Sequence, residues 1–67
     1  MKIVDARGLS CPEPLMLTEE AVKSAERPVK VLVSEPHQKM NVEKYARDHG
    51  IAFTTEETED GFAVVIG

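Results

Sequence analysis

The chain is organised around the stretch Arg7-Gly8-Leu9-Ser10-Cys11-Pro12-Glu13-Pro14, which holds its only cysteine. Proline is tolerated in the first turn of a helix, because the N–H groups there have no intrahelical partner to lose. The two closely spaced prolines precede the run Leu15-Met16-Leu17-Thr18-Glu19-Glu20-Ala21-Val22. This order predicts a helix that begins at Pro12 and reaches about Ala25. Cys11 then lies at or near the N-cap of this helix.

The predicted position of Cys11 bears on the reactivity of its thiol. The positive end of the helix dipole favours the thiolate, which is the nucleophilic form. The effect is limited, because Pro14 has no N–H to donate to a cap and the Glu13 carboxylate opposes a second negative charge. Arg7 would favour the thiolate. We therefore expect moderate activation, which suits group transfer, since an over-stabilised thiolate is a poor nucleophile. The alternative is an inert, buried cysteine that only packs.

Length and composition predict one domain spanning residues 1–67, with a small core. One cysteine and two histidines provide neither a disulfide framework nor a metal-ligand spacing, so we expect no metal and no cofactor. No apolar run has the length of a signal peptide or a membrane span, which favours the cytoplasm, where a free thiol stays reduced. The net charge is −4 and the lysines and arginines are scattered, which disfavours nucleic-acid binding.

The rest of the chain alternates between strand and helix patterns. Strands are predicted at 2–6, 29–33, 51–58 and 62–66, and a second helix from Pro36 to about His49, ended by Gly50. Asp60-Gly61 is a strong hairpin signal between the last two strands. Helix crossovers imply parallel pairing of the first two strands. The sequence therefore predicts an α/β (α+β) two-layer sandwich in the order β-α-β-α-β-β. Its four-stranded mixed sheet carries both helices on one face.

Each predicted helix has one apolar face. On the first helix, at about 100° per residue, this face contains Pro14, Leu15, Leu17, Thr18, Ala21, Val22 and Ala25. Met16 lies outside it, close to the cysteine. An exposed, flexible apolar side chain suits docking with several partners, but single surface hydrophobes are also common without any function. On the second helix His49 shares a face with Val42, Tyr45 and Ala46, so we expect it to cover the edge of the core.

Three smaller features complete the predicted surface. Asp5 is expected to brace the loop of residues 7–10 by hydrogen bonds to its backbone, and Gly8 to adopt backbone angles closed to other residues. The acidic residues Glu56, Glu57, Glu59 and Asp60 read as a solvated hairpin tip, or as a contact for a basic partner. The sheet face away from the helices would carry a semi-apolar set that indicates weak self-association or docking, namely Leu32, Ala52, Ala63 and Val65.

The stretch from Asp5 to Pro14 resembles the signature of the TusA/SirA-like sulfur-carrier family, a Cys-Pro-x-Pro motif after an Arg/Leu-Gly-Leu loop. Length and element order extend the similarity over almost the whole chain. Within the family the chain is most similar to YedF-type members, some of which are associated with selenium metabolism. The resemblance implies that Cys11 bears sulfur as a persulfide. It also implies a set of residues that support this site, namely Asp5, Arg7, Gly8, Leu9, Pro12, Glu13 and Pro14.

The same resemblance implies two protein partners: a sulfur donor, such as a cysteine desulfurase or a rhodanese-like protein, and a sulfur acceptor. The chain would then be a sulfurtransferase-like carrier rather than a stand-alone enzyme. The chain departs from the family pattern at Ser34-Glu35-Pro36 and at Arg27-Pro28. The first departure leaves the partner and the pathway open among selenium metabolism, thiolation of transfer RNA, cofactor biosynthesis and sulfur oxidation. Two other functions compete: a non-catalytic interaction or regulatory module, which would not need the Cys11 thiol, and a nucleic-acid-binding module, which would bind in a salt-dependent way.

Overall fold

The computed structural model describes residues 2–8, 13–24 and 28–67 of the chain, and only the backbone of residues 13–15. The elements follow in the order β1 (Lys2–Asp5), α1 (Glu13–Lys23), β2 (Val29–Val33), α2 (Pro36–Asp48), β3 (Phe53–Thr58) and β4 (Gly61–Ile66). The predicted order β-α-β-α-β-β is therefore confirmed. The predicted ends of the first helix, Pro12 and Ala25, lie outside the described residues. No helix among the described residues is long and apolar enough to cross a membrane.

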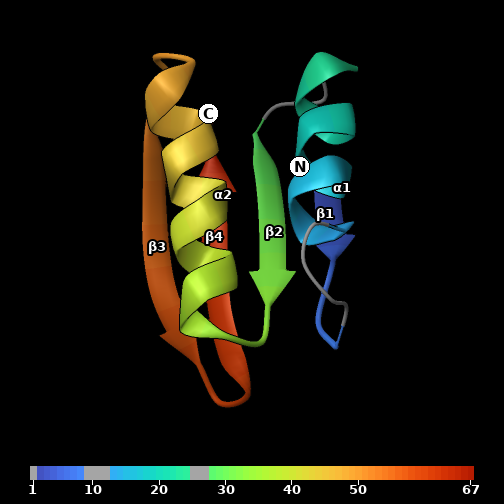
Figure 1. The fold of residues 1–67 in the computed structure, drawn as a ribbon, viewed down its shortest axis with the longest axis vertical. Coiled ribbons are helices and arrows are strands. Elements are labelled where there is room, and N and C mark those ends of the chain that lie inside the picture. The colour runs from blue at the N-terminus through green and yellow to red at the C-terminus, as the bar shows by residue number, and fades with distance from the viewer. Residues whose placement is uncertain (1, 9–12, 25–27) are drawn as a thin grey trace.

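The four strands form one mixed sheet in the order β1-β2-β4-β3. β1 runs parallel to β2, while β4 lies between β2 and β3 and is antiparallel to both. Figure 1 shows both helices in front of this sheet, with α1 over the β1 side and α2 over the β3 and β4 side. The two-layer arrangement predicted from the sequence is confirmed, and it leaves β1 and β3 as the edge strands.

The core lies between the sheet and the helices and is made largely of valine. Val29, Val31 and Val33 of β2 are fully buried, while the alternate residues Lys30 and Leu32 are half-buried on the other face. Val64 and Ile66 extend the buried row along β4. The helices supply Thr18, Ala21, Val22, Val42 and Ala46. The alternation of residues in β2 and the helical spacing of residues in α1 and α2 thus place these apolar side chains in the same layer, between the sheet and the helices.

Three predicted placements differ from the structure. Leu17 is 37% exposed, because β1 is an edge strand and no further strand covers this side chain. β3 begins at Phe53 rather than at residue 51, because the Ile51 N–H donates to the Ala46 carbonyl at 2.8 Å and so caps α2. His49 is exposed and lies on the ring of Tyr45, with the two ring centroids 4.2 Å apart. Tyr45, not His49, packs against the core.

The sheet face away from the helices is only partly open. Leu32 and Val65 are half-buried and Ala52 is exposed, so these three residues form the semi-apolar surface that the sequence predicted. Ala63 is fully buried, because its partners in register are Leu32 on one side and Glu56 on the other, and both side chains are longer.

Candidate functional site

The candidate site lies at the end of the sheet where the parallel strands β1 and β2 finish. Because these strands run in the same direction, α1 and α2 both begin at this end, and the β3–β4 hairpin turns there as well (Figure 1). Ligand sites of α/β proteins lie at the carboxyl ends of parallel strands. Cys11 lies outside the described residues, as do Leu9, Ser10 and Pro12, which fall between Gly8 and Glu13 in the sequence.

An ion-pair cluster centred on Arg7 lies at the carboxyl end of β1. The Asp5 carboxylate accepts two hydrogen bonds from the guanidinium, from Nε at 2.9 Å and from Nη2 at 2.8 Å, and a third from the Arg7 backbone N–H at 3.2 Å. Arg7 Nη1 donates to Asp60 Oδ2 at 3.1 Å. The side-chain hydrogen bond from Arg7 is the main cause that lowers the pKa of Asp5 to about 2, and the same contact raises the pKa of Arg7.

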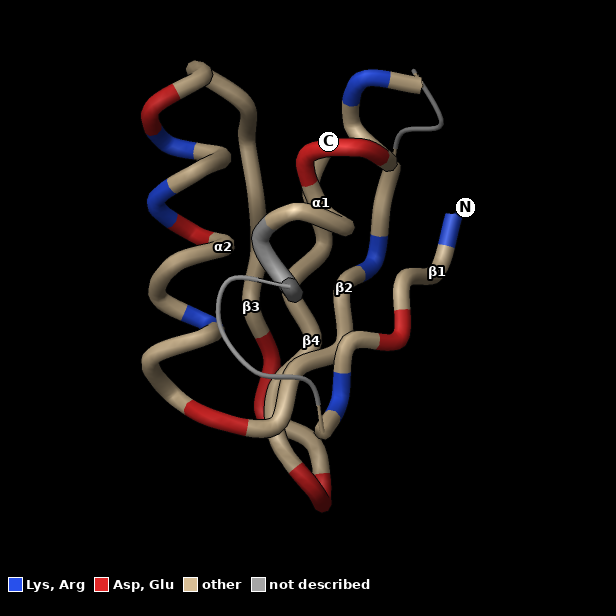
Figure 2. Tube along the Cα trace, turned by 45° about the vertical axis from the view of Figure 1, so that its right-hand side comes forward, with Lys and Arg blue, Asp and Glu red and all other residues tan. Residues whose placement is uncertain are grey.

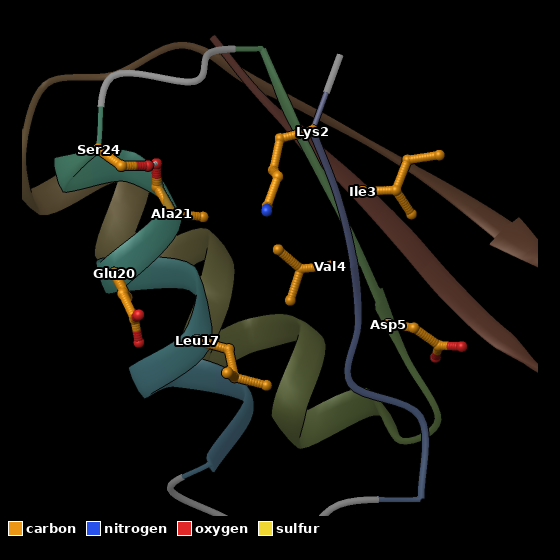
Figure 3. A pocket seen from close by; sticks show the side chains of 8 residues that line it. All are labelled: Lys2, Ile3, Val4, Asp5, Leu17, Glu20, Ala21 and Ser24. Atoms are coloured by element: carbon orange, nitrogen blue, oxygen red, sulfur yellow. Dashed lines mark hydrogen bonds between the residues drawn. The ribbon is translucent and has the colours of Figure 1, made fainter.

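This cluster changes the role expected for Arg7. The sequence suggested that its charge would favour a Cys11 thiolate, but two carboxylates offset that charge in the structure. Figure 3 shows the Asp5 side chain pointing away from α1, on the opposite side of β1 from Val4 and Leu17. Arg7 is therefore bound to a carboxylate that faces away from the helix. Sequence reasoning missed the pairing with Asp60, since nothing in the chain links two residues 53 positions apart.

The next residue, Gly8, is tied to a different element. It has a φ of +79°, a conformation that glycine adopts without steric cost. Its N–H donates to Ser34 Oγ at 2.9 Å, and the Ser34 N–H in turn donates to Gln38 Oε1 at 3.4 Å. Gln38 is only 5% exposed. The start of the loop is thus connected through Ser34 to the first turn of α2.

The described part of α1 presents its polar face to solvent. Glu13 and Pro14 belong to α1, but their side chains lie outside what the structure describes. Met16 is 62% exposed, as the helical pattern predicted, and its docking role stays a prediction. Further along, Lys23 Nζ donates to Glu19 Oε1 at 2.9 Å, which lowers the pKa of Glu19 and raises that of Lys23. This i,i+4 pair supports the helix rather than the site.

Neither histidine joins the cluster in the described part of the chain. His37 Nδ1 lies 3.3 Å from Glu35 Oε2 at the start of α2, and His49 Nδ1 lies 2.9 Å from the Tyr45 carbonyl oxygen at its end. Among the described residues no group of three or more His, Cys, Asp or Glu side chains is arranged to hold a metal ion. The described residues at this end of the sheet therefore supply anchoring contacts and charge.

We expect the Asp5–Arg7 pair to make stability pH-dependent in acid. The hydrogen bonds from Arg7 lower the pKa of the Asp5 carboxyl to about 2 in the folded protein, against an ordinary value of 3.8. The pair therefore stabilises the fold above about pH 4. That contribution is lost as pH falls through the folded pKa. Asp5→Asn should lower the urea midpoint at pH 7, and the difference from wild type should shrink as pH approaches 2. Arg7→Gln should show the same trend, because Arg7 causes the shift. A constant difference between pH 7 and 2 would contradict this assignment.

Together these features define a small two-layer α/β domain with an anchored loop at the carboxyl end of its parallel strands. A protein-family model described as "Sulfurtransferase TusA" matches residues 2–67, so the chain belongs to the TusA sulfurtransferase family. Among solved structures, the SirA-like protein from Desulfitobacterium hafniense superimposes with a TM-score of 0.88 at 25% sequence identity, over 100% of this chain and 97% of that one. A comparison with curated proteins gives no match.

Proposed function

We propose that this protein is a sulfur carrier that holds sulfur as a persulfide on Cys11 and passes it between two partner proteins. The observation that carries the proposal is the family match over residues 2–67, because it assigns almost the whole chain to a sulfurtransferase family. The sequence adds that Cys11 is the only thiol in the chain. A dithiol oxidoreductase needs a second, resolving cysteine, whereas a carrier needs only one.

The proposed transfer conserves atoms and electrons at each step. The Cys11 thiolate attacks the terminal sulfur of a persulfide on the donor protein. A new S–S bond forms at Cys11, the S–S bond of the donor breaks, and the donor cysteine leaves as a thiolate. An acceptor thiolate then attacks the terminal sulfur on Cys11 in the same way. The sulfur atom changes its carrier without net oxidation or reduction, so no redox cofactor takes part.

Two described features support this role for the Cys11 segment. Glu13, two residues after Cys11, is the first residue of α1, and a helix N-terminus favours a nearby thiolate. Gly8, three residues before Cys11, lies at the same end of the sheet. In this proposal Pro12 and Pro14 shape the helix start, Leu9 belongs to the supporting loop, and the exposed Met16 is a docking contact.

The family assignment favours partner proteins over a free small molecule as the two ends of the relay. We propose a cysteine desulfurase or a rhodanese-like protein as the donor and a thiol-bearing protein as the acceptor, in a reducing compartment such as the cytoplasm. The similarity to YedF-type members makes a selenium-related pathway one branch of the proposal. In this proposal the single thiol accepts and releases sulfur, so the chain acts as a carrier rather than as a stand-alone enzyme.

Sulfur loading tests the proposal directly. The purified protein is incubated with a cysteine desulfurase and cysteine, and its intact mass is recorded with and without a reductant. We expect a gain of one sulfur atom that the reductant removes. The matched control is the same protein alkylated beforehand with iodoacetamide, which blocks its only thiol and should prevent any gain. Absence of a gain on the untreated protein, or an equal gain on the alkylated protein, would contradict the proposal.

A further inference from the structure

We infer that the edge strand β1 is a self-association site, at which two copies of the chain pair antiparallel with Ile3 of each copy at the two-fold axis. This role of β1 is separate from the proposed sulfur transfer, because it depends on the edge of the sheet and not on the thiol. Two features of the edge support it: backbone groups that point away from the sheet, and exposed apolar side chains on both faces beside them.

The outer side of β1 carries backbone hydrogen-bonding groups. The Ala6 N–H donates toward β2, to the Leu32 carbonyl at 2.9 Å. Backbone groups alternate between the two sides of a strand, so the N–H and C=O groups of Ile3 and Asp5 point away from β2. In the described part of the chain no strand lies on that side, because β1 is at the edge of the sheet. Such a row of groups can pair with a strand from another molecule.

The side chains beside this edge are apolar and exposed. Ile3 is 59% exposed, and Figure 3 shows it on the opposite side of β1 from Val4. On the helix side, Leu17 borders a groove of about 390 Å³ between α1 and β1, which Val4 and Ala21 also line. The helical pattern assigns Leu17 to the buried face of α1, but the sheet ends at β1 and leaves this side chain partly exposed. A strand added at β1 would cover both Ile3 and Leu17.

The other edge of the sheet, β3, is protected against such pairing. It carries Glu56 and Glu57, and Figure 2 shows acidic residues in the lower part of β3 and at the turn that follows. A side chain of α2 also reaches this strand, because Glu43 Oε2 accepts a hydrogen bond from Thr55 Oγ1 at 2.6 Å. Charged side chains are a common means of preventing pairing at a sheet edge. The two central residues of β1 are both apolar, so this protection is weaker at β1.

The charges of β1 favour one register for a pair of identical strands. Residues that face each other must lie on the same face of the sheet, so the two-fold axis passes through a residue. Centring on Lys2 or on Asp5 places like charges directly opposite each other. Centring on Val4 places the Asp5 carboxylate opposite Ile3. Centring on Ile3 places two isoleucines opposite each other, with two reciprocal backbone hydrogen bonds between them. The methylene stem of Lys2 then lies opposite Val4 of the second copy.

This pairing makes a weak dimer that leaves both candidate sites accessible. Two strands of four residues form a small interface, and interfaces below about 1,200 Å² are typical of transient association. Each copy has a net charge of −4, so the copies repel each other at low salt and added salt screens that repulsion. The two β1 strands run in opposite directions. The carboxyl ends of the parallel strands therefore face opposite ends of the joined sheet, away from the interface.

Sedimentation velocity tests the pairing between about 10 µM and about 1 mM protein, with a reductant present so that no disulfide joins two chains. We expect a monomer–dimer equilibrium with a Kd on the order of 100 µM, which falls as salt is added. Ile3→Lys should raise the Kd about tenfold or more, because it places two lysines opposite each other. Thr54→Lys is the matched control. Thr54 is exposed and lies in the same cross-strand row as Ile3, but on β3, so the variant adds the same charge and should keep the wild-type Kd.

Amide hydrogen exchange gives a second readout that needs no variant. The Ile3 amide should exchange more slowly at the top of the concentration range than at the bottom, whereas the Ala6 amide, which already donates to the Leu32 carbonyl, should not change. A wild-type protein that stays monomeric overturns self-association and leaves the edge to a strand from a different protein. A dimer that Ile3→Lys does not weaken, or Ile3 exchange that does not depend on concentration, also overturns it. A Kd raised only in Ile3→Lys, with slowed exchange at Ile3, supports it.

Discussion

Cys11→Ser is expected to abolish sulfur transfer completely. A serine hydroxyl cannot form a persulfide, and it remains protonated at neutral pH, so the variant has no group that can carry sulfur. A simple acceptor makes the measurement independent of the natural partner. Cyanide attacks the terminal sulfur of a persulfide, releases the cysteine thiolate and leaves as thiocyanate. Loaded wild-type protein, freed from donor and cysteine, should yield about one equivalent of thiocyanate, and Cys11→Ser should yield only background.

The result for Cys11→Ser also distinguishes the carrier from the interaction module. Serine differs from cysteine by one atom, so the urea midpoint of the variant shows whether the fold has changed. A folded variant without transfer supports the carrier. Background thiocyanate from both folded proteins would contradict the carrier and would favour the non-catalytic module, in which the Cys-Pro-x-Pro stretch only shapes the chain.

The fold was predictable wherever a local pattern and the global arrangement agree. Val29, Val31 and Val33 alternate with Lys30 and Leu32, and the strand has the predicted bounds with the three valines buried on one face. Pro36 begins α2 as the first-turn preference of proline requires. Asp60-Gly61 marks the hairpin between β3 and β4. Each of these signals depends only on residues close together in the chain. The sequence alone is therefore sufficient to predict the element that each signal marks.

The anchoring of the site was not predictable in the same way. The acidic hairpin residues read as a solvated tip, and this is correct for their exposure, but Asp60 also pairs with Arg7 across the end of β2. Such a contact follows from strand order, which brings the hairpin beside β2 only after the sheet has formed. Leu17 shows the same dependence, since helical spacing assigned it to the core while the edge position of β1 leaves it partly exposed. The roles of Cys11 and its neighbours in sulfur transfer stay predictions.

Gly61→Ala, at the half-buried first residue of β4, is expected to be strongly destabilising. The added Cβ would meet backbone atoms of Val33 and Ser34, which cannot rotate away as a flexible side chain could. Steric overpacking costs about 1–3 kcal/mol, against a total stability of roughly 3–10 kcal/mol for a chain of this length. Taking the middle of both ranges, we expect the urea midpoint to fall by about a third.

Gly50→Ala is the matched control for this substitution. Both glycines have a positive φ, +155° at Gly61 and +66° at Gly50, but a Cβ at Gly50 would meet nothing within 4 Å. The variant should lose only the backbone preference of glycine, about 1 kcal/mol. Equal losses in the two variants would show that the hairpin does not need its close approach to β2. A larger loss at Gly61 would show that the close approach of the hairpin to β2 contributes to the stability of the fold.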